Sequence, residues 1–277
     1  MRGRDEILYH IAESYDALGD TASTKRYLDR LIAEFPDADY RIEAHFRRAE
    51  IAFSANAFDR AAADYSFVVD QGTSNVYWQN ANYMLGWTRL KQSSYEQSLD
   101  RFFATIDALL VGDEVAGAAA QEMLDDTLRA VVLDVLYLDG PKTLARRFEA
   151  LHKPAWQYRV YGRLAEDLRR KERYLDSVAA LETFVEQNPY DARSPDFAER
   201  SIEILTDANF PAEARRHKEA FVARYRYDSD FWIVNGIAGR DRLAATYKAH
   251  LMEVAKLAHR DAQVGRLLLG QARQLRP

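Results

Sequence analysis

Cysteine is absent from this 277-residue sequence. Its absence excludes disulfides, thiolate metal sites and cysteine nucleophiles. Glycine and proline are scarce, at 12 and 7 residues, and long runs of β-branched residues are missing. Because glycine and proline interrupt helices and β-branched residues favour strands, this composition favours helices. With 48% hydrophobic and 12% aromatic residues, a sizeable core can form, and we predict an all-α fold.

Long apolar runs are also missing. No stretch approaches the roughly 18 apolar residues of a membrane span, and the opening "MRGRDEILYH" lacks the apolar stretch of a signal peptide. We therefore expect no direct membrane span. The protein is expected to be cytoplasmic, or to be an exported chain whose signal has been removed.

Charge is distributed unevenly along the chain. The formal net charge is -5 and the pI is near 5.8, which argues against nucleic acid as the main partner, because phosphate binding requires a basic surface. Residues 240–277 nevertheless hold eight Lys/Arg against three Asp/Glu. The simplest interpretation of this basic end is a solvated helix face.

Patterns for catalysis or metal binding are missing from the sequence. Its histidines form no HExxH motif and no i, i+4 pair, so we expect them at helix surfaces or caps: His10, His45, His152, His217, His250 and His259. Asp125 and Asp126 are adjacent, but neighbours on a helix point about 100° apart and cannot act as a facing acid/base pair. The glycines of "NGIAG" lack a phosphate-binding pattern. We predict no catalytic residue, no cofactor site and no metal site.

A repeated pattern does stand out. The stretches "FDRAAADY" from Phe58, "YEQSLDRF" from Tyr95 and "YLDSVAAL" from Tyr174 each place a small residue three positions after an aromatic and a large apolar residue four beyond that. The first two lie 37 residues apart, and the next gap of 79 is about two such steps. The same offset relates three further sets: Ala12, Ala49 and Gly86; Thr24, Ala61 and Ser98; Leu28, Tyr65 and Phe102. Small residues on two helices allow close approach, so we predict a repeated two-helix unit.

Helix ends fall at the positions that this unit requires. Gly19 lies between the two helices of the first copy, where a left-handed residue ends a helix at low cost, and Asn56 and Ser93 take its place in the next two copies. Pro36 and Pro189 close the first and fifth copies, where the chain leaves a helix.

These residues resemble the tetratricopeptide repeat, a pattern of about 34 residues with a large/small apolar pair, an aromatic, a small residue, an aromatic and a proline. The first copy matches at Ile11, Ala12, Tyr15, Gly19, Thr24, Leu28 and Pro36, and the fifth at Leu164, Ala165, Tyr174, Ser177, Leu181, Phe184 and Pro189. Arg48 and Arg89 depart from it, because they occupy normally apolar or aromatic places. The resemblance implies a right-handed α-solenoid of antiparallel helix pairs.

The repeat divides the chain into four parts. Three repeats are predicted within 1–112 (5–38, 42–75 and 79–112) and two within 158–227 (158–191 and 194–227). Residues 113–157 are predicted to form a degenerate pair, with helices at 114–138 and 142–151 separated by "DGP" and a bend at "HKPAWQY". Residues 228–277 are predicted to be a linker and a long helix that starts a further repeat. We place Ser194 at the N-cap of the sixth pair.

The final helix carries an apolar stripe at helical spacing, formed by Leu243, Tyr247, Leu251, Val254 and Leu257. The stripe is expected to pack on the preceding repeat or on a second chain, so oligomerisation through this helix is an open alternative. Three consecutive leucines, Leu267 to Leu269, follow without a capping helix. We expect the chain to be a segment of a longer repeat protein.

The resemblance also implies that the first helix of each pair lines a concave groove that binds a protein or peptide. The groove residues would be Tyr9, His10 and Glu13 from the first copy, Phe46, Arg47, Glu50 and Phe53 from the second, Asn80, Tyr83, Trp87 and Leu90 from the third, and Arg159, Arg163, Glu166 and Arg170 from the fifth. The first three copies would thus be aromatic and the fifth basic, and both characters are typical of binding hot spots. Alternatively, Phe46, Tyr83 and Trp87 pack as core.

The predicted function is that of a noncatalytic interaction scaffold. The stretch "FPDADYRIEAHFRRAE" is similar to tetratricopeptide lipoproteins of the Gram-negative cell envelope, which implies a bacterial, periplasmic or envelope-associated complex. Two alternatives stay open. One is a cytoplasmic regulatory module, and the other is the helical scaffold of an envelope enzyme whose catalytic domain lies outside this segment.

Overall fold

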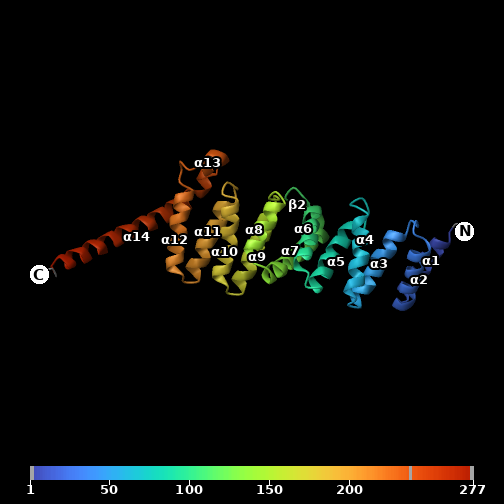
Figure 1. The fold of residues 1–277 in the computed structure, drawn as a ribbon. Helices are drawn as coiled ribbons and strands as arrows, with labels where there is room; N and C mark the ends of the chain where they lie inside the picture. Colours follow the sequence, from blue (N-terminus) through green and yellow to red (C-terminus); the bar gives the residue numbers. More distant parts are fainter. Residues whose placement is uncertain (1–2, 237–238, 275–277) are drawn as a thin grey trace. The chain divides into compact units, whose positions relative to one another are not determined.

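Helices make up most of residues 3–236 and 239–274, which are the residues that the computed structural model describes (Figure 1). Within these residues the only strands form one short hairpin. The chain divides into two compact units, Met1–Gly140 and Pro141–Pro277, named unit 1 and unit 2 below. The division falls within the "DGP" stretch, between Gly140 and Pro141. Over the described residues no helix is long and apolar enough to cross a bilayer.

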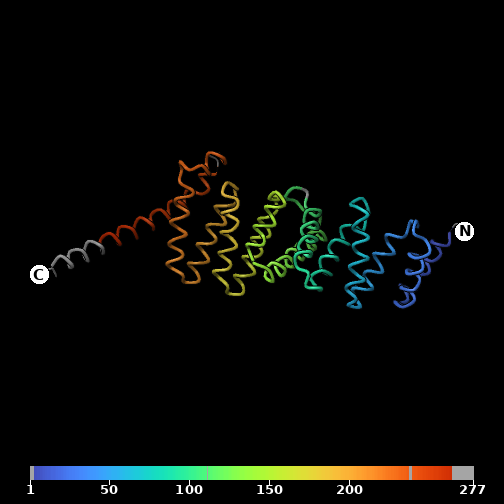
Figure 2. The backbone as a smooth tube through the Cα atoms, viewed as in Figure 1, coloured from blue at the N-terminus to red at the C-terminus, as the bar shows by residue number. Residues whose placement is uncertain are grey.

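Unit 1 is built from three consecutive helix pairs and one further helix. Its elements are α1 (Arg4–Ala17), α2 (Thr21–Glu34), α3 (Arg41–Ser54), α4 (Phe58–Asp70), α5 (Trp78–Lys91), α6 (Tyr95–Leu109), β1 (Leu110–Val111), β2 (Glu114–Val115) and α7 (Gly117–Tyr137). Each helix packs on the next one along the chain, and Figure 2 shows the short turns between them. The three predicted repeats are therefore antiparallel helix pairs. The helix predicted from residue 114 begins three residues later, because β1 and β2 pair as an antiparallel hairpin.

Unit 2 continues with helices only, over the residues described. Its elements are α8 (Pro141–Ala150), α9 (Gln157–Arg170), α10 (Tyr174–Gln187), α11 (Ser194–Asp207), α12 (Pro211–Arg224), α13 (Asp230–Asn235) and α14 (Arg240–Gln274). The pairs α9/α10 and α11/α12 correspond to the two predicted C-terminal repeats. The N-cap of α11 is Arg193 rather than the predicted Ser194. The Ser194 hydroxyl instead donates to the Asn188 carbonyl, at 2.6 Å.

One backbone conformation recurs at the corner of five helix pairs. Gly19, Asn56, Ser93, Glu172 and Asn209 have φ angles of 73°, 56°, 57°, 58° and 60°. After each of them, the next amide N–H bonds to the carbonyl five residues back, as in Ala57 to Ala52 at 2.8 Å and Arg173 to Leu168 at 3.0 Å. This bond caps the first helix and turns the chain into the second. The predicted corner role of the first three residues is confirmed, and the last two extend it.

Close approach of paired helices rests on the predicted small residues. All nine residues of the three repeated sets are buried: Ala12, Ala49 and Gly86; Thr24, Ala61 and Ser98; Leu28, Tyr65 and Phe102. Gly86 leaves no room for a side chain, because a Cβ built there would lie 2.6 Å from the Phe102 ring. The Ser98 hydroxyl donates to the Gly86 carbonyl at 3.0 Å, and Ser177 repeats this bond to Ala165 at 2.7 Å.

The final helix α14 packs on α12 over its first half. Leu243 and Tyr247 are buried as predicted, and His250 is buried beside the Phe221 ring. Leu251, predicted in the same stripe, is 42% exposed. Ion pairs continue the contact from Lys218 to Glu253 at 2.5 Å and from Arg215 to Asp261 at 2.6 Å. Val254 and Leu257 are half-buried. The leucine run at 267–269 lies outside the side chains that the structure describes.

Candidate functional site

The first helices of the unit 1 pairs share one face with α7. On this face Arg47 of α3 reaches the carboxylates of Glu13 and Asp16 on α1, at 3.9 and 3.7 Å. Tyr83 of α5 donates a hydrogen bond to Asp126 of α7. We call this surface the first-helix face and define it by its solvent-reaching side chains: Glu13, Asp16, Arg47, Glu50, Tyr83, Trp87, Glu122, Asp125, Asp126 and Arg129.

Arg47 is held most closely by its own helix. Its guanidinium lies 2.7 Å from the Glu43 carboxylate, one turn earlier. Burial acts to lower the pKa of Arg47, but the hydrogen bond to Glu43 and the surrounding negative charge raise the pKa above its usual value. Arg47 therefore stays charged, and the Glu43 carboxylate is its closest counter-charge.

Two of the predicted groove aromatics lie in the core. Tyr9 is 4% exposed and stacks on Tyr40 with ring centroids 4.2 Å apart. Its hydroxyl bonds to Glu43, as does that of Tyr77. Burial and the Glu43 carboxylate raise the pKa of Tyr77 to about 12. Phe46 is 9% exposed and packs against Tyr77 at 5.2 Å. Tyr9 and Phe46 thus support the face from beneath.

The other predicted aromatics are half-buried. The edge of Trp87 meets Phe102 at 5.7 Å, and Trp87 lies 6.4 Å from the Tyr83 ring. Burial, together with the hydrogen bond to Asp126, raises the pKa of Tyr83 to about 12. Phe53 meets Phe58 edge-on at 5.6 Å. Each ring is anchored on one side while part of it reaches solvent, which suits the aromatic anchors of protein interfaces.

A hollow of about 410 Å³ opens between α1, α2 and α3. It is lined by Asp16, Thr21, Thr24, Arg47, Glu50, Ile51, Ser54 and Ala55. The first-copy residue His10 lies outside this hollow, exposed, with its ring 2.9 Å from the Glu13 carboxylate. Of the predicted residues, Arg47 and Glu50 line this hollow, and Glu13 lies 3.9 Å from Arg47.

The arginines predicted from the fifth copy have carboxylate neighbours. Arg163 lies 3.3 Å from Asp167, and Arg170 lies 3.1 Å from Glu166. Arg200 of α11 approaches the same Glu166 at 2.6 Å. The hydrogen bond from Arg169, followed by those from Arg170 and Arg200, lowers the pKa of Glu166 to about 2. The remaining predicted residue, Arg159, lies 5.3 Å from the Tyr158 ring. The Arg200–Glu166 pair links α11 to α9, whereas the other pairs lie within α9.

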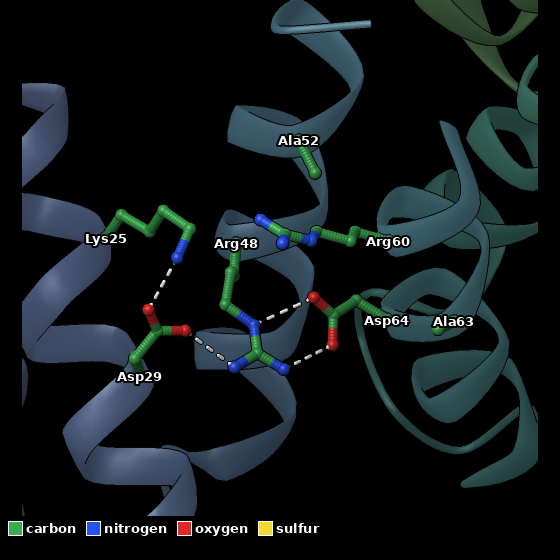
Figure 3. Close-up of a pocket in the computed structure, with 7 residues that line it drawn as sticks. All are labelled: Lys25, Asp29, Arg48, Ala52, Arg60, Ala63 and Asp64. Atoms are coloured by element: carbon green, nitrogen blue, oxygen red, sulfur yellow. Dashed lines mark hydrogen bonds and ion pairs between the residues drawn. The ribbon is translucent and has the colours of Figure 1, made fainter. Parts of the chain in front are cut away.

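A second cluster was not predicted, and it lies between the second helices of the first two pairs (Figure 3). Arg48 of α3 donates two hydrogen bonds to Asp64 of α4, at 2.8 and 2.7 Å, and one to Asp29 of α2, at 2.8 Å. His45 shares Asp64 at 2.7 Å. Burial acts to raise the pKa of Asp64, but the hydrogen bonds from His45 and Arg48 hold it below its usual value. The departure of Arg48 from the repeat pattern was the signal for this cluster.

Two histidines correct the expectation that histidines lie at helix surfaces. His45 is 7% exposed and stacks on Phe67 at 3.8 Å. His250 is also 7% exposed, and its Nε2 lies 2.5 Å from the Glu199 carboxylate. Over the described residues no three side chains among His, Cys, Asp and Glu are grouped to hold a metal ion.

Asp134 of α7 is a buried carboxyl that the sequence did not reveal. It is fully buried, and neither carboxyl oxygen has a hydrogen-bond partner among the described residues. Burial raises the pKa of Asp134 to about 7, and the nearby Ser98 hydroxyl opposes that shift.

Stacked antiparallel pairs with a recurring left-handed corner define a helical repeat protein. Residues 6–38 match the family model of the tetratricopeptide repeat, and the resemblance of the sequence to this repeat is confirmed. No curated protein matches this chain.

Several solved structures are similar to this chain at low sequence identity. A tetratricopeptide repeat protein from Parabacteroides merdae is 13% identical, with 92% of each chain covered and a TM-score of 0.42. PilF from Pseudomonas aeruginosa is 16% identical, with 82% of this chain and 94% of PilF covered and a TM-score of 0.38. YrrB, described as having an unusual peptide-binding site, is 15% identical, with coverages of 74% and 95% and a TM-score of 0.35.

Proposed function

We propose that this protein is a noncatalytic scaffold that binds another protein or a peptide through the first-helix face of unit 1. The observation that carries the proposal is the pairing of anchored, half-exposed Tyr83 and Trp87 with a hollow bordered by Asp16, Arg47 and Glu50. Aromatic anchors beside oriented charges are typical of the centre of protein interfaces. The match of residues 6–38 to a repeat whose stacked pairs form extended binding surfaces supports the same proposal.

The setting we propose is a bacterial envelope complex, with this chain as part of a longer repeat protein. The likeness of "FPDADYRIEAHFRRAE" to envelope lipoproteins supports this setting. The alternatives are a cytoplasmic regulatory module and the helical scaffold of an envelope enzyme. The gene sequence on either side of this segment distinguishes them, through an export signal upstream or a non-repeat domain with its own motif downstream.

The test is affinity capture from envelope and cytosolic fractions of the source cells, followed by reconstitution with the purified partner. We compare the wild-type chain with Trp87→Ala and with Asp125→Lys, a substitution of an exposed residue that leaves the core untouched. Tyr190→Ala, an exposed aromatic in unit 2, is the matched control. We expect both face variants to lose the partner and the control to retain it, with circular dichroism confirming that each folds. Retention of the partner by both face variants would place the binding surface elsewhere.

A further inference from the structure

The hollow in the first-helix face is lined by two carboxylates, Asp16 and Glu50, and by one cation, Arg47. Its net charge is therefore negative. Glu50 borders the hollow and makes no hydrogen bond or ion pair with any side chain in the described part of the chain. Asp16 approaches Arg47 only to 3.7 Å, whereas Glu43 takes the same guanidinium at 2.7 Å. Two carboxylates therefore face this space without a close cation of their own.

The surroundings of Glu50 make this imbalance costly. Loss of water around the Glu50 carboxyl raises its pKa, Arg47 acts in the opposite direction, and the negative charge of Asp16 raises it further. Glu50 keeps contact with solvent at the mouth of the hollow, so the carboxylate can be reached from outside. A cation arriving there gains attraction from both carboxylates in a partly enclosed space, where charge pairs are screened less than on an open surface.

The same sign of charge continues along the face on α7. Glu122, Asp126 and Arg129 follow at spacings of four and three residues, so they form one stripe on that helix, and the exposed Asp125 lies beside it. Its single cation, Arg129, is already paired with Asp126 at 2.5 Å. The whole first-helix face carries six carboxylates, including Glu13, and two guanidinium groups.

We infer that the partner of this face is a cationic peptide segment, with one lysine or arginine side chain entering the hollow between Asp16 and Glu50. The hollow of about 410 Å³ is many times the roughly 30 Å³ that a water molecule occupies, so a guanidinium group fits. Apolar residues of the same segment pack on Tyr83 and Trp87, and its further cations meet the α7 stripe. This inference rests on the proposed function and adds the chemistry of the partner.

The probe is a fluorescent eight-residue peptide with three arginines among alanine and leucine residues, followed by anisotropy on the full chain. Its matched control replaces the arginines with citrulline, which keeps the shape and removes the charge. We expect the arginine peptide to bind at least tenfold more tightly than the citrulline peptide. The difference should shrink as salt rises from about 50 to 500 mM, because exposed charge pairs are screened.

Variants locate the bound cation. Glu50→Gln and Asp16→Asn are each expected to weaken arginine-peptide binding about three- to tenfold, and Glu50→Lys to abolish it. Glu203→Gln, an exposed glutamate on α11, should bind like the wild type. Equal binding of the two peptides, or unchanged binding in both Glu50→Gln and Asp16→Asn, would overturn the inference.

The outcomes separate this inference from the proposed function. If the peptides bind equally while Trp87→Ala and Asp125→Lys still lose the partner captured from cells, the cationic chemistry is wrong and the scaffold stands. If those variants also keep their partner, both fail. A labelled peptide of residues 262–277, which has three arginines and no acidic residue, serves as a further probe. Tighter binding of this peptide than of the eight-residue arginine peptide would identify the occupant as a second copy of the chain, whereas weaker binding would assign the face to a separate cationic partner.

Discussion

At the residue scale, Gly86 shows how tightly the helices of a pair are packed. A methyl group added there would lie 2.6 Å from the Phe102 ring, which is fully buried and cannot move away freely. We expect Gly86→Ala to lower the free energy of unfolding by about 1–3 kcal/mol, the usual cost of overpacking a core. Thermal and urea unfolding followed by circular dichroism measure the change.

Gly162 provides the matched control. It lies in α9, where an added Cβ would meet only Phe197, at 3.8 Å. Because alanine favours helices by about 1 kcal/mol over glycine, Gly162→Ala should be neutral or stabilising. A Gly86→Ala protein as stable as Gly162→Ala would show that the first and second helices are not in tight contact at Gly86.

Asp134 makes stability depend on pH. Its pKa of about 7 in the folded chain lies above the ordinary value near 4 in the unfolded chain. The folded state therefore binds the extra proton between these values, and stability falls as pH rises from about 4 to 7. The total effect is at most about 4 kcal/mol, from roughly 1.4 kcal/mol for each pKa unit.

The variant Asp134→Asn removes this titration. We expect its stability relative to the wild type to rise between pH 4.5 and pH 8, as measured by urea unfolding at both values. Asp70→Asn, an exposed aspartate on α4, should show no such trend. A constant difference between Asp134→Asn and the wild type across this pH range would mean that the carboxyl is ionised in the folded protein.

At the element scale, the left-handed corners give a prediction for turn chemistry. Glu172 occupies a corner with φ of 58°, although a side chain in this conformation costs roughly 1–2 kcal/mol. We expect Glu172→Gly to raise the free energy of unfolding by about 1 kcal/mol, measured by chemical denaturation. Asn209→Gly should gain less, because asparagine tolerates this conformation. Destabilisation by Glu172→Gly would show that its side chain makes a contact worth more than the strain.

The helix pairs could be predicted because each depends on local signals. A small residue, an aromatic and a corner residue repeat at a spacing of 37, and each acts within one pair. The hairpin of Leu110–Val111 and Glu114–Val115 could not be predicted, because strands of two residues leave no alternating pattern. Because of this hairpin, α7 begins at Gly117 rather than at residue 114. Nothing in the repeat pattern indicates the hairpin.

The site was less accessible to prediction than the fold. Helix periodicity places Tyr9, Phe46 and Trp87 on one side of their helices but does not state their depth, and two of the three are core residues. Burial of His45 and His250 depends on Asp64 and Glu199, which lie 19 and 51 residues away. Contacts at such distances follow from the stacking of pairs, and a single sequence does not report them.

At the scale of the whole molecule, the two units should respond separately to a local change. Trp78 and Trp87 lie in unit 1, and Trp156 and Trp232 lie in unit 2. In a repeat protein each pair contacts only its neighbours. We expect Gly86→Ala to lower the unfolding midpoints of the first two tryptophans more than those of the other two. Fluorine NMR of 5-fluorotryptophan-labelled protein in a urea series reports each ring. If the four signals instead shift together, the units unfold as one.

The Arg48 cluster has a consequence for how the first two pairs separate under stress. It joins α2, α3 and α4 through charged groups, whereas the core between the second and third pairs is made of buried apolar side chains. The cost of removing ions from water falls with temperature, whereas protonation of Asp29 and Asp64 removes the attraction altogether. We therefore expect this contact to be among the last to loosen on heating. In acid it should loosen only below the usual pKa of aspartate, because the pKa values of Asp29 and Asp64 are lowered.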